Sequence, residues 1–145
     1  MRITGVKLLD GQSRPAETLR TGDPLQIVME YQADARIPEP NFQFVISAAG
    51  GVQLICASSA VVGYVPDWIE GHGKVVCAFD AMPLLPRAYS VLANICTVDR
   101  RTDYDTLPDA ARFSVTTPQD TGELPAGLPV GESALVEVPF TMHSG

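Results

Sequence analysis

The sequence is poor in the residues that build metal sites and redox motifs. It has 3 cysteines and 2 histidines, and it has no Cys-x-x-Cys spacing. Structural zinc sites take about four Cys or His ligands, so we expect no metal site. Cys56, Cys77 and Cys96 all fall in strand-like runs, which predicts three buried free thiols and a cytosolic chain. A buried disulfide between adjacent strands is the alternative.

Positive charge is also scarce. There are 10 Lys and Arg against 17 Asp and Glu, a net charge of −7. Nucleic acids and anionic lipids attract clustered Lys and Arg, so neither is an expected partner, and a neutral or cationic partner is easier to accommodate. No run approaches the ~20 apolar residues of a membrane helix, and the first residues lack the apolar core of a signal peptide. We therefore expect no direct membrane insertion.

Catalytic motifs are missing as well: the sequence has no Gly-rich phosphate loop, no GxSxG and no HExxH. The densest carboxylate group comprises Asp99, Asp103, Asp105 and Asp109. A calcium loop or a glycosidase acid–base pair would use such residues, but an EF-hand's glycine and closing glutamate are absent, and Arg100 and Arg101 interrupt the group. We interpret it as a solvated loop and expect no enzyme and no cofactor.

Turn residues and alternating apolar runs are abundant instead. The 12 glycines and 12 prolines suit many strands joined by turns. Apolar residues alternate at 75–79 and at 89–98, and Pro83 and Pro86 break the chain between them because proline cannot donate to a β ladder. We predict that the other strands pack around this pair.

Six further runs read as strands: residues 3–9, 25–31, 42–48, 52–59, 113–115 and 133–141. About eight strands without helical segments predict an all-β fold, an antiparallel β-sandwich. We expect loops at 32–40, 60–72 and 100–109, and one helical turn at 107–112. The domain would span residues 1–116, followed by a linker plus C-terminal strand at 117–145.

Polar side chains share the outward parity of four strands: Gln26, Glu30, Gln43, Ser47, Gln53, Ser90 and Asn94. Amide groups both donate and accept, which matches sugar hydroxyls. Tyr64 and Trp68 could stack on a pyranose from the neighbouring loop. The alternative is an ordinary solvated sheet face, on which Trp68 caps the core edge. The predicted glycan-binding residues are Gln43, Ser47, Gln53, Tyr64, Trp68 and Asn94. For 52–59, the alternation places Leu54 and Cys56 inward and Ile55 and Ala57 outward.

Three stretches resemble one known family. Residues 79–91 read FDAMPLLPRAYSV, similar to its LPLLPGRYSL signature, with Arg87-Ala88 where Gly-Arg is expected. Residues 104–115 read YDTLPDAARFSV and match its YD-x-L-x-x-A-x-x-F-x-V ending. The opening at 6–11 and 19–25 is similar to its LLDADG…LRTGEPL start. The family is the C-terminal carbohydrate-binding domain of Wzt-type ATP-binding subunits, which belong to ABC transporters that export O-antigen polysaccharide.

The resemblance implies a jelly-roll or immunoglobulin-like sandwich that binds polysaccharide for export and catalyses nothing. Its partners would be the transporter ATPase and membrane subunits. It would lie on the cytoplasmic side of the inner membrane. The sequence contains no Walker A motif, so the ATPase half is not part of it.

The alternative function is a structural dimerisation module without its own glycan site. Residues 116–132 are rich in Pro and Gly, and so long a connection predicts that strand 133–141 reaches a distant partner. We expect a homodimer in which this strand pairs with the partner's sheet, an exchange the resemblance also suggests.

Overall fold

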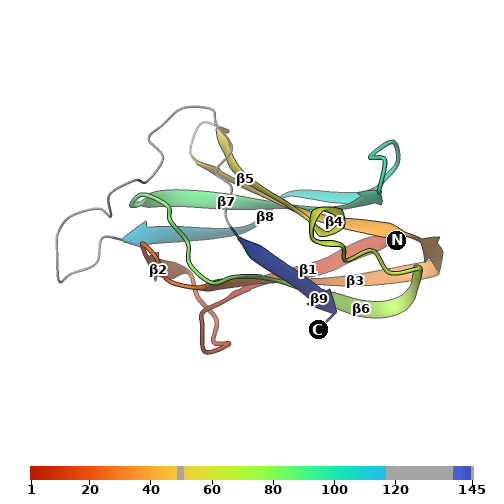
Figure 1. The fold of residues 1–145 in the computed structure, drawn as a ribbon, viewed down its shortest axis with the longest axis horizontal. Helices are drawn as coiled ribbons and strands as arrows, with labels where there is room; N and C mark the ends of the chain where they lie inside the picture. Colours follow the sequence, from red (N-terminus) through yellow and green to blue (C-terminus); the bar gives the residue numbers. More distant parts are fainter. Residues whose placement is uncertain (49–50, 117–138, 145) are drawn as a thin grey trace.

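Two β-sheets face each other across an apolar core in the computed structural model, which describes residues 1–48, 51–116 and 139–144 (Figure 1). Sheet A contains β1 (Arg2–Leu9), β3 (Leu25–Pro38), β6 (Trp68–Phe79) and β9 (Phe140–Ser144), in the order β1-β3-β6-β9. Sheet B contains β2 (Thr18–Arg20), β8 (Asp103–Thr116), β7 (Arg87–Thr97), β4 (Pro40–Ala48) and β5 (Gln53–Ser58), in the order β2-β8-β7-β4-β5. The predicted all-β sandwich is confirmed.

All paired strands run antiparallel except β2, which lies parallel to β8. The core forms because alternate residues of both sheets point inward and bury their apolar side chains. Fully buried examples are Ile27 and Met29 of sheet A and Phe42, Phe44 and Val91 of sheet B. At one end, Tyr31 of β3 packs on Phe42 with ring centroids 5.7 Å apart, and its ring lies over Gly73, where a Cβ would collide with it.

The two runs around the proline corner are both strands, but they do not form a pair. β6 pairs with β3 and β9 in sheet A, whereas β7 pairs with β4 and β8 in sheet B. Residues 80–86 therefore carry the chain from one sheet to the other. The corner is fastened to the turn after β2: the Met82 N–H donates to the Asp23 carbonyl at 2.9 Å, and the Thr21 hydroxyl donates to the Leu84 carbonyl at 2.9 Å.

Two of the three expected mid-chain loops, 32–40 and 100–109, are largely strand, and the third, 60–72, is strand only from Trp68 onward. The helical turn predicted at 107–112 is wrong. β3 continues to Pro38, and a single residue, Glu39 with a φ of 43°, separates it from β4. β6 begins at Trp68, and β8 begins at Asp103. These segments lack clear alternation, and their strand conformation comes from hydrogen bonding to neighbours far away in the sequence, which overrides weak local propensity.

The faces of β5 are the reverse of those predicted. Ile55 pairs with Ile46 and Ala57 with Phe44, so both point into the core, while Cys56 and Leu54 point outward and are half-buried. The irregularity between Ile46 and Ser47 shifts the register, which the alternation within β5 cannot reveal.

The three cysteines are free, as predicted, but only Cys77 lies in the core. Burial raises the pKa of the Cys77 thiol, which keeps it protonated. Cys96 is buried on the outward side of β7, next to the Asn41 amide, and Cys56 is partly exposed. The prediction of three buried thiols is therefore wrong for Cys56.

β9 overlaps the end of the strand predicted at 133–141, and residues 133–138 lie outside the described part of the chain. The described residues contain one helical element, the short 3-10 turn η1 (Ser59–Val62). None of them forms a helix long and apolar enough to cross a membrane.

Candidate binding groove

The outer face of sheet B is hollowed by a groove of about 830 Å³ where β2, β8 and β7 lie side by side. Its polar lining consists of Glu17, Thr18, Ser90, Asp109, Arg112 and Ser114. Ala48 and Gly51, which flank the turn between β4 and β5, bound it on the other side. The groove is open to solvent.

Small side chains and a bulge together create the hollow. Ala88 pairs with Ser114, and Ser90 pairs with Arg112, so the floor carries little side-chain volume. Val91 of β7 pairs with Ala111 of β8, and Ala93 pairs with Leu107. β8 therefore has more residues than β7 over this stretch and forms a bulge. Pro108 and Asp109 lie in this bulge and line the groove. A proline fits there because a bulged residue does not need to donate to the ladder.

Arg112 and Asp109 form the central charged pair of the groove. The Arg112 Nε donates to both carboxylate oxygens of Asp109, at 3.1 and 3.0 Å, and Nη2 donates to Oδ2. The hydrogen bonds from Arg112 hold the pKa of the Asp109 carboxyl below its usual range and raise the pKa of Arg112. Both groups stay ionised, and the two N–H donors of Nη1 remain for other contacts.

Two predicted site residues lie beside the groove. Ser47 of β4 pairs with Gln53 of β5 on one side and with Ser90 of β7 on the other, so all three form one row on the outer face. Gln53 is exposed and Ser47 is half-buried. The outward parity of sheet B was therefore a useful signal for these positions.

Gln43 and Asn94 pair with each other further along the same face. The Gln43 amide donates to the Cys56 sulfur at 3.0 Å. Asn94 is only 6% exposed, and its amide donates to the Thr106 hydroxyl at 2.8 Å and the Asp105 carbonyl at 3.2 Å. Its side chain fastens β7 to β8 and has little surface for a ligand.

The two aromatic residues lie away from these four. Trp68 begins β6 in sheet A and is 48% exposed, with the Arg36 guanidinium 4.1 Å from its ring centroid. Tyr64 follows η1 and stacks on the core residue Phe42 at 6.1 Å. Gln26 and Glu30, which share the outward parity, belong to β3 and so face outward from the opposite sheet.

Sequence reasoning missed Glu17, Thr18, Arg112 and Ser114 as groove residues. Arg112 and Ser114 alternate with the buried residues Phe113 and Val115, and this short alternation could have extended the strand predicted at 113–115. Thr18 could not have been found in this way, because it reaches the groove through the parallel pairing of β2 with Ser114.

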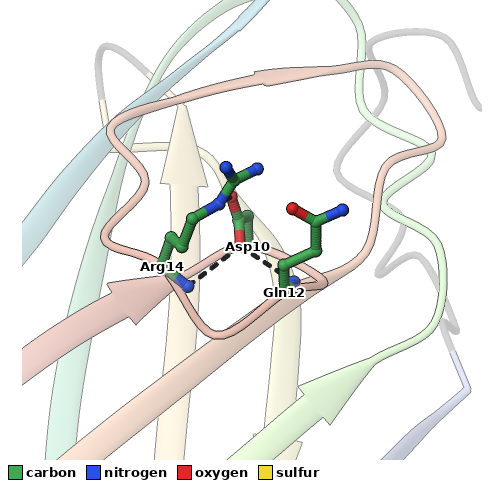
Figure 2. A network of polar contacts seen from close by, with 3 residues as sticks. All are labelled: Asp10, Gln12 and Arg14. Carbon is green, nitrogen blue, oxygen red and sulfur yellow. Dashed lines mark hydrogen bonds and ion pairs between the residues drawn. The ribbon is translucent and has the colours of Figure 1, made fainter.

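Three acidic residues outside the groove, Asp10, Asp99 and Asp105, accept hydrogen bonds from backbone N–H groups. Asp105 accepts the Ile3 N–H at 2.7 Å and thus ties β8 to β1, and Asp99 accepts the Arg101 N–H at 3.0 Å within a turn. Asp10 accepts the N–H groups of Gln12 and Arg14 at 2.9 and 3.0 Å, which closes the turn after β1 (Figure 2). In the described ranges, no three His, Cys, Asp or Glu side chains gather as metal ligands.

The fold and the groove define a two-sheet β-sandwich domain with an open polar groove on one outer face. A family model, the Wzt C-terminal domain, matches residues 1–128, so the chain belongs to the Wzt C-terminal domain family. This membership supports a role in the O-antigen ABC transporter. The Wzt C-terminal domain is a regulatory or binding domain and is distinct from a catalytic domain.

The structure is also similar to a crystal structure of the C-terminal domain of wzt, with a TM-score of 0.68 and 16% sequence identity. The alignment covers 79% of this chain and 72% of that one, and at this identity it shows a shared fold. The search of curated proteins found no match.

Proposed function

We propose that this domain is a non-catalytic carbohydrate-binding module that holds O-antigen-type polysaccharide in the groove of sheet B for export by an ABC transporter. It would act on the cytoplasmic side of the inner membrane, with the transporter ATPase and membrane subunits as its partners.

The single observation that supports glycan binding is the groove itself. It is open to solvent, and its hydroxyl groups on Thr18, Ser90 and Ser114 can each donate to and accept from sugar hydroxyls. The Arg112–Asp109 pair adds donors and acceptors that are fixed on a strand. Each net hydrogen bond contributes about 0.5–1.5 kcal/mol, so a few of them predict millimolar to micromolar affinity.

The test is to fill the groove. Ser90→Trp places an indole on the floor between Ser47 and Arg112, and we expect it to abolish binding of O-antigen oligosaccharides in calorimetric titration. The matched control is Gln26→Trp, a half-buried outward position on the opposite sheet, which should bind like wild type. Equal affinity of the wild type and Ser90→Trp would place the site elsewhere.

The second candidate, a structural dimerisation module, has its support at the edge of sheet A. β9 pairs only with β6, and it contributes Met142 to the core and Phe140 against Phe79 at 5.8 Å. A short terminal strand that buries apolar side chains is suited to exchange between two copies. A dimer that responds to no glycan would favour this function over the first.

A further inference from the structure

The described lining of the groove has more negative than positive side chains. Three of its lining side chains carry charge: Glu17, Asp109 and Arg112. Arg112 is already bound by Asp109 through both carboxylate oxygens, so these two charges cancel within the pair. Glu17 remains, so the formal charges of the described lining residues sum to −1.

The positive charge of the guanidinium is therefore already neutralised by Asp109, which occupies its Nε and Nη2 donors. A carboxylate or phosphate group on a sugar would have to displace Asp109 from Arg112 or lie beside it as a second negative charge. Both arrangements cost free energy, because the Asp109–Arg112 hydrogen bonds are charge-assisted and like charges repel at short range. Glu17 adds to the repulsion from the β2 side of the groove.

The same pair suits neutral hydroxyl groups. Arg112 keeps the N–H donors of Nη1, and the Asp109 carboxylate can accept further hydrogen bonds, so hydroxyls of a sugar can meet one of each. Ser90 pairs with Arg112 across the strands, and Ser114 follows Arg112 on the same face of β8. The hydroxyl hydrogen of each serine can rotate, so each hydroxyl can donate or accept.

We infer that the groove selects neutral, hydroxyl-rich glycans and discriminates against glycans that carry carboxylate or phosphate groups. This inference rests on the proposed function, since it names the substrate class of the same groove. The residues that impose the discrimination are Glu17 and Asp109.

The experiment compares two probes that differ in charge. Neutral O-antigen oligosaccharides, and the same oligosaccharides after oxidation of their primary alcohols to carboxylates, are titrated into the full chain by calorimetry. We expect oxidation to weaken binding by about tenfold or more, and we expect the neutral probes to bind with an affinity that hardly changes with salt.

Variants separate charge from shape. Asp109→Asn removes a negative charge and releases Arg112, so it should restore most of the affinity for the oxidised probe, and Glu17→Gln should restore part of it. Glu70→Gln makes the same charge change on β6 of the opposite sheet and should restore nothing.

Two results would overturn the inference, and they differ in what they leave standing. If oxidised probes bind as tightly as neutral ones, and Ser90→Trp abolishes that binding, the groove binds glycans but does not select neutral ones. The same holds if neither carboxylate variant restores affinity. If no probe binds, or Ser90→Trp changes nothing, the proposed function fails together with the inference.

Discussion

The outer faces of the two sheets carry different chemistry. The face of sheet B is hollowed by the 830 Å³ groove and lined by hydroxyl groups and one internally neutralised ion pair. The face of sheet A has a smaller hollow of about 390 Å³, which Thr4, His72 and Lys74 line together with Glu30. Lys7 pairs with Glu30 at 3.0 Å across this face.

This difference shows that polar residues of one parity do not make a binding face. Gln26 and Gln43 follow the same rule of alternation, yet they face outward from opposite sheets. What distinguishes sheet B is depth, and depth comes from the small residues Ala88 and Ser90 and from the bulge of β8.

The largest effect should come from the edges of the sheets. Deleting residues 117–145 removes β9 and uncovers the edge of β6 beside the core residues Cys77 and Phe79. Loss of the buried Met142 alone should lower the free energy of unfolding by roughly 2–5 kcal/mol. We expect aggregation or destabilised monomers, measured by sedimentation and thermal melting.

The full-length chain is the control for the deletion. With an exchanged strand it should sediment as a homodimer at micromolar concentration, and a full-length monomer would contradict the exchange. A truncated chain with unchanged melting would show that β9 contributes little to sheet A.

The next largest effect should come from replacing a cation in the groove of sheet B, compared with replacing a cation on the outer face of sheet A. Arg112→Ala removes the donors of the groove and leaves Asp109 without its partner, so glycan affinity should fall about tenfold or more. Lys74→Ala, on the outer face of sheet A, should bind like wild type in the same titration. Equal losses in both variants would remove the distinction between the faces.

A smaller effect should rank the residues predicted from the sequence. Gln53→Ala, beside the groove, should weaken glycan binding a few-fold, to roughly tenfold at most. Trp68→Ala should leave it unchanged, because Trp68 belongs to sheet A and contacts Arg36. Both variants should be titrated after their melting has been checked. The reverse ranking would move the site to the end of sheet A.

The smallest effect should come from a turn that belongs to neither face. The N–H groups of Arg14 and Gln12 hold the pKa of Asp10 below its usual range (Figure 2). A lowered pKa in the folded state stabilises the fold above the unfolded-state pKa, about 3.9, and this contribution disappears as pH falls through the folded-state value. Asp10→Ala should therefore slightly lower the melting temperature at pH 7.

The matched variant is Asp10→Asn, which keeps an acceptor and should lose less than the alanine variant. In acid, at about pH 2, the difference between wild type and Asp10→Ala should shrink. A difference that stays constant from pH 7 to acid would mean that the charge of Asp10 has no role in the turn.

Several strands could be predicted because their residues alternate strongly. In 25–31, 42–48, 75–79 and 89–98, one row of side chains is apolar, and a strand with one apolar face must bury it, whatever its partners are. The thiols could be predicted as free from their number and spacing, and Ser47 could be placed on the outward face from the alternation of 42–48.

Other features depend on partners distant in sequence. The first part of β8 reads as a polar loop at 100–109 and a helical turn at 107–112, and it is a strand because it pairs with β7. The faces of β5 follow the register imposed by β4. The opposite placement of Gln26 and Gln43 follows from the crossing at Glu39, where β3 of sheet A ends and β4 of sheet B begins.

Local alternation thus specified the fold class, because burial of an apolar strand face needs no particular neighbour. The tertiary structure decided which strands share a sheet and where β8 bulges, because strand order and register depend on hydrogen bonds between distant residues. The groove is made of that bulge and of the residues that strand pairing brings beside it, Thr18 from β2 among them.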